Sequence, residues 1–223
     1  TLERDLPWVA LRSAEGYPIL GGRVMTSTGV DLDPIEFERV FVEDQVDRST
    51  ALHSSLHGRP YACGPLARVN LAFDQLGTEA RALAEELGLT PPTTNPFLGI
   101  LARLVEMVEV MAEAERLIEG HAPLSSPCAD LPRRAGWGAS CVEAPRGVLY
   151  HRYEVDEGGR IVSACVVTPT SQNQGAIEAD LWAAAPEIAE LSREDATHLA
   201  ERVVRNHDPC ISCATHSVLL LDA

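Results

Sequence analysis

One long amphipathic helix limits what this chain can fold into more than any other segment does. Asn95-Pro96 offers an N-cap followed by a proline at the first helical position, and Gly120 follows the last periodic residue. We therefore expect a helix of about 25 residues, whose single apolar face requires a packing partner. That face carries Phe97, Leu101, Leu104, Val108, Met111 and Ile118.

The segment before this helix is the predicted partner. Apolar residues at mostly helical spacing run through residues 68–88, and the pattern stops at Gly88. Because the linker around Pro91-Pro92 is short, the two helices should form an antiparallel pair over residues 68–120. The sequence thus predicts a helical bundle.

Residues 1–67 are expected to be irregular apart from one further helix. Asp33-Pro34-Ile35-Glu36 provides an N-cap, a proline in the first turn and a glutamate three residues past the cap. This pattern predicts a helix that runs to about Gln45. The frequent glycine and proline residues before it favour irregular structure.

After Gly120 the pattern changes from helix to loop and then to strand. Several prolines and glycines predict a loop over residues 121–147. Val, Ile and Tyr are frequent on both sides of Asp156-Glu157-Gly158-Gly159, which predicts a β-hairpin within residues 148–170. Residues 171–223 then hold two helices, near 176–191 and 192–205, the second with its N-cap at Ser192, and a cysteine motif. The expected fold class is mainly α with one β-hairpin, an α+β fold.

Composition and charge exclude some classes of protein. With 45% hydrophobic residues the chain can form a core, and a net charge of -15 disfavours nucleic acid and anionic membrane surfaces as partners. No apolar run reaches the roughly 18 residues of a membrane span, and no signal segment is recognisable. Six cysteines without framework spacing favour a reducing, cytoplasmic compartment. Thr1, in place of an initiator methionine, suggests a piece of a longer protein.

The strongest chemical signal is the run Asp208-Pro209-Cys210-Ile211-Ser212-Cys213-Ala214-Thr215-His216. Two thiolates separated by two residues can bind one soft metal ion, and the histidine adds a third donor. Three alternatives are a redox-active pair, half of a zinc site and two thiols without a function. A thioredoxin-like pair needs a following helix in a βαβ unit, and structural zinc needs a fourth donor. Metal chemistry is therefore the leading hypothesis. We interpret the remaining cysteines as core residues: Cys63, Cys128, Cys141 and Cys165.

Two further segments hold residues that suit an anionic ligand. Arg146 follows Pro145 at the start of the predicted hairpin, and the hairpin returns the chain to Pro169-Thr170 beside it. A fixed guanidinium in that place is suited to a small anion. Alternatively, Arg146 is a surface arginine, Thr170 is a helix cap and Asp208 is a turn residue at a helix end.

Together these segments resemble the C-terminal half of the large (alpha) subunit of nickel-iron hydrogenases, in particular the cytoplasmic, multimeric group linked to soluble electron carriers. The matching pieces occur in the family's order and extend over nearly the whole chain. The resemblance implies the helical-bundle fold of that subunit. It rests on Arg59-Pro60-Tyr61, Gly64-Pro65-Leu66-Ala67-Arg68, residues 143–151, Pro169-Thr170 with Asn173, and residues 205–216.

The resemblance implies two metal sites. At a Ni-Fe(CO)(CN)2 centre, Cys210 would be a terminal thiolate on nickel and Cys213 a bridge between nickel and iron. His216 matches a ligand of a buried Mg2+ ion, and the carbonyl of Val166 falls at another position of that ion.

The resemblance also implies residues around the nickel-iron centre. Arg146 would lie over the open coordination position, and Thr170 would donate a hydrogen bond to a cyanide nitrogen. Pro145 and Pro169 belong to the same cofactor-binding segments. Asp208 matches the aspartate that holds this arginine in place.

This chain lacks the Arg-x-Cys-Gly-x-Cys motif that supplies the family's other two nickel cysteines. The implied partners are therefore the N-terminal half of the large subunit, an iron-sulfur small subunit, diaphorase-type electron-carrier subunits, a maturation endopeptidase and metal-insertion chaperones. The completed enzyme would oxidise H2 reversibly and pass electrons to a soluble carrier such as NAD(P), whereas this chain alone would be inactive. Residues 217–223 would be an uncleaved or a retained tail.

The alternative to an enzyme is a non-catalytic, truncated fragment, or a metal-binding or assembly module that holds a structural divalent ion. Retention of Cys210 and Cys213 favours a hydrogenase over the related subunit of respiratory complex I, which has lost the nickel cysteines. A cystine on the exterior, or two sulfurs far from Arg146 and Thr170, would contradict the metal centre.

Overall fold

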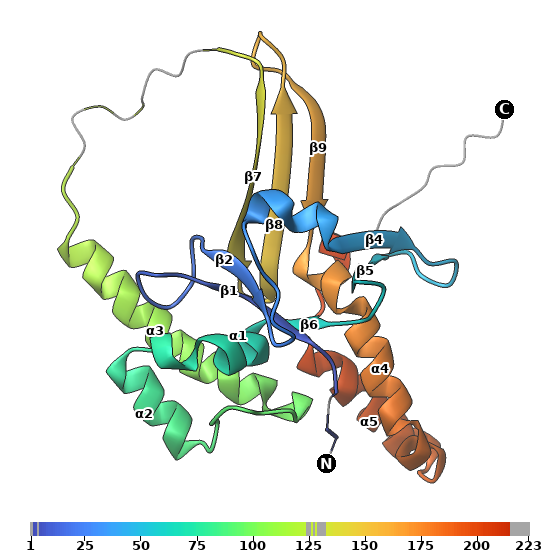
Figure 1. The fold of residues 1–223 in the computed structure, drawn as a ribbon. Coiled ribbons are helices and arrows are strands. Elements are labelled where there is room, and N and C mark those ends of the chain that lie inside the picture. The colour runs from blue at the N-terminus through green and yellow to red at the C-terminus, as the bar shows by residue number, and fades with distance from the viewer. Residues whose placement is uncertain (1, 4, 124–125, 127, 129–132, 215–223) are drawn as a thin grey trace, which may run out of the picture.

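A computed structural model describes residues 1–223 except 1, 4, 124–125, 127, 129–132 and 215–223. Figure 1 shows a small N-terminal sheet between two groups of helices, and a three-stranded sheet that extends away from it. The structure is 43% helical and 24% strand, so it holds more sheet than the one expected hairpin. It is a mixed α and β fold.

Residues 1–67 contain strands where we expected irregular structure. The central strand β1 (Trp8–Arg12) pairs antiparallel with β2 (Arg23–Thr26) and parallel with β6 (Ala62–Cys63), and β3 (Asp31–Leu32) pairs with β2. Trp8 to Leu11 are all buried. A short, continuously apolar strand lacks the alternation by which strands are recognised, which explains the error.

The helix predicted from Asp33 to Gln45 is wrong beyond its first turns. The Asp33 side chain accepts a hydrogen bond from the Ile35 N–H, as a cap should, but the helix is a 3-10 helix that ends at Arg39 (η1, Pro34–Arg39). The next residues form β4 (Phe41–Gln45), which pairs antiparallel with β5 (Leu52–Leu56). Aromatic and β-branched residues at 40–42 favour this strand over a longer helix.

The long helix is confirmed, and its partner is divided into two. The Asn95 side chain caps η3 (Pro96–Leu98), which continues into α3 (Gly99–Glu119). The expected helix over residues 68–88 is instead α1 (Pro65–Ala72), η2 (Phe73–Gln75) and α2 (Thr78–Glu86). The break at Gly77 is held by α3, because the Gly77 N–H donates to Glu109 Oε2 at 2.7 Å. Both α1 and α2 pack against α3.

The predicted hairpin is confirmed, but it belongs to a sheet of three strands. β8 (Gly147–Val155) and β9 (Ile161–Val167) pair antiparallel, and Asp156 Oδ1 accepts hydrogen bonds from two turn N–H groups. The part of the expected loop from residue 136 onward is strand β7 (Gly136–Ala144), which pairs with β8. Its glycines suggested a loop, but they occupy an edge strand, where a weak strand former is tolerated.

The last helices follow the sheet closely. α4 (Pro169–Ala189) begins earlier than the expected residue 176, because Thr168 is its N-cap. α5 (Arg193–Asn206) begins at the predicted Ser192 cap and packs on α4, and α6 (Ile211–Ala214) follows. No described helix is long and apolar enough to cross a membrane.

An aromatic stack joins the N-terminal part to the three-stranded sheet. The Phe37 ring lies 4.5 Å from Tyr150 on β8 and 4.3 Å from Phe41 on β4, measured between ring centroids. All three side chains are buried in one hydrophobic cluster with residues of β1 and β2. A second cluster lies among β1, α1, α2 and α3. These clusters hold the three sheets of the described residues and the helices together.

Replacing Phe37 by alanine should destabilise the chain strongly. The substitution removes a fully buried ring from the stack and leaves a cavity, which costs about 3 to 5 kcal/mol of unfolding free energy. Ile35→Ala on the same short helix is the control, because Ile35 is exposed, and it should cost less than about 0.5 kcal/mol. Urea unfolding followed by circular dichroism measures both, and equal losses would contradict this account of the core.

Candidate metal centre

The tip of the β7–β8 hairpin carries two of the predicted site residues. Ala144 pairs with Gly147, so Pro145 and Arg146 form a two-residue turn. The carbonyls of Ala144 and Pro145 accept hydrogen bonds from Arg68 of α1, each at 3.1 Å. Arg146 thus extends from a turn whose backbone is attached to a helix.

The structure places Arg146 beside Asp208. Arg146 Nε donates to the Asp208 carbonyl oxygen at 2.6 Å and lies 3.1 Å from Asp208 Oδ2. Asp208 has a φ of 48°, a left-handed conformation that aspartate adopts more readily than most residues, and its N–H donates to the Arg205 carbonyl at the end of α5. The side chains are 36% and 45% exposed, so water weakens this ion pair.

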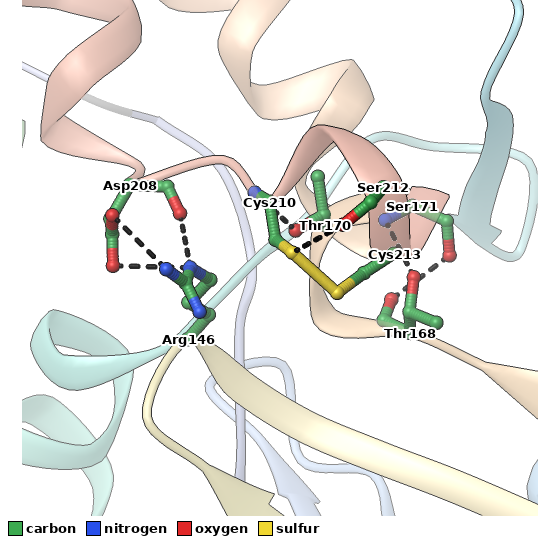
Figure 2. Close-up of a disulfide and its surroundings, with 8 residues drawn as sticks. All are labelled: Arg146, Thr168, Thr170, Ser171, Asp208, Cys210, Ser212 and Cys213. Carbon is green, nitrogen blue, oxygen red and sulfur yellow. Dashed lines mark hydrogen bonds and ion pairs between the residues drawn. A yellow bond between two sulfur atoms is a disulfide. The ribbon is translucent and has the colours of Figure 1, made fainter. Parts of the chain in front are cut away.

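The first turn of α4 contacts the cysteine motif. The Cys210 N–H donates to Thr170 Oγ1 at 3.1 Å, as Figure 2 shows. The helix cap is Thr168, whose hydroxyl accepts from the Ser171 N–H, so Thr170 has no capping role. Pro169 is the first residue of α4. Thr170 is buried and directs its hydroxyl to the backbone of the motif.

Cys210 and Cys213 are joined by a disulfide in the structure (Figure 2). We expected two separate thiolates, and the cystine corrects that expectation. The condition that would contradict the metal centre, a cystine on the exterior, is met for Cys213 but not for Cys210, whose backbone is bound to the buried Thr170. The two residues lie within one turn of chain, with Cα atoms 5.4 Å apart, so their sulfurs converge on one point. Cys213 is exposed and Cys210 is half-buried. A cystine has no thiolate to offer, so this pair can bind metal only after reduction.

As metal donors, the two sulfurs are an incomplete set. Once reduced, they fit one soft metal ion, because they reach the same point beside Arg146 and Thr170. Among the residues that the structure describes, no group of three or more His, Cys, Asp or Glu side chains is placed to hold a metal ion. A metal ion held by these sulfurs would need further ligands from outside the described residues.

The predicted Mg2+ site is not assembled by the described residues. His216 lies outside them. Val166 is on β9 opposite His151, and its side chain is 40% exposed. The Mg2+ assignment stays a prediction.

A small cavity of about 20 Å3 adjoins the site. It has room for about one water molecule. His207, the C-cap residue of α5, is fixed there by a 2.8 Å hydrogen bond between its Nε2 and Asp180 Oδ2 of α4. Burial lowers the pKa of Arg103, although Asp208 opposes this effect. The cavity lining includes Cys63, Arg103, Arg146, Asn206 and His207.

The other cysteines only partly follow the expectation of core packing. Cys63 and Cys141 are buried, and burial raises the pKa of each thiol to about 12, so both stay protonated. Cys165 is half-buried. Cys128 is exposed, which contradicts the prediction.

Comparison with known proteins identifies the family. A match to the nickel-dependent hydrogenase family covers residues 52–216. The chain belongs to this family. It is 34% identical over 209 residues to the alpha subunit of sulfhydrogenase 1 from Pyrococcus furiosus, a match over 92% of this chain and 48% of that relative.

One further sequence relative and one solved structure support membership of this family. The chain is 34% identical to an F420-non-reducing hydrogenase polypeptide of Methanothermobacter thermautotrophicus, over 71% of this chain and 35% of that protein. Its fold matches an NAD+-reducing NiFe-hydrogenase in the H2-reduced state with a TM-score of 0.80 and 26% identity, over 96% of this chain and 51% of that chain. The chain thus spans about half the length, or less, of these relatives.

Sequence reasoning missed one group of buried charges next to the site. Arg68 lies between Glu106 of α3 and Glu143 of β7, at N–O distances of 2.5 Å and 2.6 Å. Arg68 belongs to a motif that we used for the resemblance, but the sequence did not indicate its contacts. Glu106 lies outside the predicted apolar face of the long helix, so its burial was not expected. Burial raises the pKa of Glu143 to about 7, although Arg68 opposes that shift.

The raised pKa of Glu143 predicts a pH-dependent stability. Between its ordinary value of 4.5 and about 7, the folded state keeps a proton that the unfolded state has lost, so stability falls as pH rises. Between pH 5 and 7 the unfolding free energy of the unsubstituted protein should fall by about 2 to 3 kcal/mol relative to that of Glu143→Gln. Above pH 8 the difference between the two unfolding free energies should be constant. Urea unfolding of both proteins across this range is the measurement. Parallel stability curves would show that Glu143 titrates normally.

Proposed function

We propose that this chain is the C-terminal portion of a nickel-iron hydrogenase large subunit, to whose metal centre it supplies two thiolate ligands. One observation supports this most: the motif with Cys210 and Cys213 lies against Thr170 and next to the Arg146–Asp208 pair. The family match and the similar solved structure support the same class. The reaction would be the reversible oxidation of H2.

Each residue of the site has a distinct proposed role. An external dithiol reductant that opens the cystine is itself oxidised to a disulfide and leaves two thiols, which lose their protons when they bind metal. A bound nickel-iron centre supplies the heterolytic cleavage of H2. Arg146 keeps a fixed positive charge at the open side of the sulfurs, and Asp208 holds its orientation. Thr170 Oγ1 accepts a hydrogen bond from the Cys210 N–H, and the Thr170 hydroxyl is proposed to donate one to a cyanide nitrogen of the centre.

The remaining ligands belong to the half of the relatives that this chain does not span. That half is proposed to cover α3, where apolar side chains including Met107, Met111 and Ile118 are exposed along the helix. Diaphorase-type subunits, together with an iron-sulfur small subunit, would carry electrons to a soluble acceptor such as NAD(P). The proposed partners also include a maturation endopeptidase and metal-insertion chaperones. A Mg2+ ion bound by His216 is proposed in addition to the nickel-iron centre.

Metal analysis of the reduced protein tests this proposal. The full chain, co-expressed with the N-terminal half of a relative and with metal-insertion chaperones, should contain nickel and iron. Infrared bands of bound carbon monoxide and cyanide should also be present. Cys210→Ser and Cys213→Ser should each lose most of the nickel, because each removes one of two soft donors from this chain. Mass spectrometry of metals and infrared spectroscopy are the measurements.

Cys128→Ser is the matched control, since it removes an exposed thiol away from the motif and should keep the full nickel content. Nickel content that is unchanged in both motif variants would refute the thiolate role. Zinc alone, without the infrared bands, would favour the alternative of a module that holds a structural divalent ion.

A further inference from the structure

We propose that Arg68 is a positioning residue, which holds the tip of the β7–β8 hairpin so that Arg146 stays against Asp208. Its consequence for catalysis rests on the proposed function, whereas its effect on Arg146 can be measured on the chain without metal. Arg68 contacts neither the cysteines nor Asp208 in any interaction described above, so it would act through the backbone of the turn.

All five N–H donors of the Arg68 guanidinium have an acceptor. Nε and one terminal nitrogen donate to the two oxygens of Glu106, at 2.5 Å and 2.7 Å. The other terminal nitrogen donates to Glu143 Oε2 at 2.6 Å. The two remaining hydrogen bonds go to the carbonyls of Ala144 and Pro145. Arg68 is 3% exposed, so these contacts are protected from water.

The two carbonyls fix the turn from which Arg146 extends. They belong to the residues immediately before Arg146, and a two-residue turn has no other backbone to absorb a movement. The next carbonyl, that of Arg146, lies against Gly64, the N-cap residue of the same helix. A side chain at Gly64 would bring its Cβ within 2.7 Å of this oxygen, and Gly64 has a φ of 110°. Three successive carbonyls therefore face α1.

The carboxylates that hold Arg68 are themselves fixed. Glu143 Oε1 accepts a hydrogen bond from the Leu11 N–H of β1 at 2.7 Å, and Glu106 Oε1 accepts one from the Tyr17 hydroxyl at 2.6 Å. The guanidinium is thus anchored to α3, β7 and the N-terminal sheet together. An arginine that only neutralised a buried carboxylate would not need two further N–H donors directed at the carbonyls of the turn.

Arginine and lysine differ in the property that matters here. A lysine ammonium carries the same charge but has three donors at one point, and it lacks the planar fork that reaches two carboxylates and two carbonyls. Arg68→Lys should therefore preserve much of the charge pairing and release the turn. Arg12→Lys is the matched control, because Arg12 also binds a carboxylate, that of Asp74, and a helix carbonyl, that of Leu71, but not the hairpin tip.

The test is the local order of Arg146 in the reduced, metal-free full chain. In Arg68→Lys, the Nε–H signal of Arg146 in a nitrogen-edited NMR spectrum should broaden or disappear. Hydrogen exchange of the Arg146 and Gly147 amides should accelerate by about tenfold. Arg12→Lys should change neither. Circular dichroism and cooperative unfolding establish that each variant is folded. A folded Arg68→Lys variant with an unchanged Arg146 signal and unchanged exchange would overturn the proposal.

A second variant keeps the test decisive if Arg68→Lys does not fold. Glu106→Gln retains the guanidinium and the shape of the side chain but weakens the anchor, so the Arg146 signal should shift and exchange should accelerate less than in Arg68→Lys. Unchanged signals and exchange in a folded Glu106→Gln variant would also overturn the proposal.

In the assembled enzyme, Arg68→Lys should lower kcat for H2 oxidation while nickel content stays full. Loss of nickel in the two cysteine variants is a separate result, so a failure of the proposed function remains distinguishable.

Discussion

The buried charge of Arg68 is the constraint on which the surroundings of the cysteine motif depend. Removing a guanidinium from water costs several kcal/mol unless charged and polar partners surround it. Here the partners come from α3, from β7 and from the hairpin tip, and α3 and the hairpin are distant from Arg68 in sequence. None of them satisfies Arg68 alone. The helices and the three-stranded sheet must therefore assemble together, and this assembly sets the position of the turn that carries Arg146.

A second constraint acts through the two residues before α1. The backbone of Cys63 exchanges hydrogen bonds with the Asn173 side chain, at 3.0 Å and 3.2 Å, and this fixes the first turn of α4 with Thr170. Gly64, the next residue, lies against the Arg146 carbonyl. Adjacent residues thus place both Thr170 and Arg146, and Thr170 in turn binds the Cys210 backbone. Contacts within the chain thus bring the segments of Arg146, Thr170 and Cys210 together without a contribution from a metal ion.

The sequence predicted what depends on neighbouring residues and missed what depends on distant ones. The caps at Asn95 and Ser192 were predicted correctly, because a cap binds N–H groups two or three residues away. The pairing of β7 with β8 was missed, since glycines on an edge strand resemble a loop. Glu106 has the spacing of a solvated helix residue, and only the fold shows that it binds Arg68. Arg146 and Asp208 were grouped because the family resemblance implies that the aspartate holds the arginine in place. The structure places them in contact, while their roles in catalysis stay predictions.

The exposure of the motif follows from how these constraints are arranged. The hairpin tip and α4 approach the cysteines through Arg146 and Thr170, yet Cys213 and much of Asp208 remain accessible to water. A metal centre that excludes water needs an additional wall there, and the same wall is where additional thiolates would have to be carried. Among the described residues, each sulfur has the other as its nearest reactive partner, in agreement with the cystine found there. Under the proposed function, the further ligands and the cover would therefore have to come from the same side of the motif, because a polypeptide that supplied only one of them would leave the pair free to oxidise.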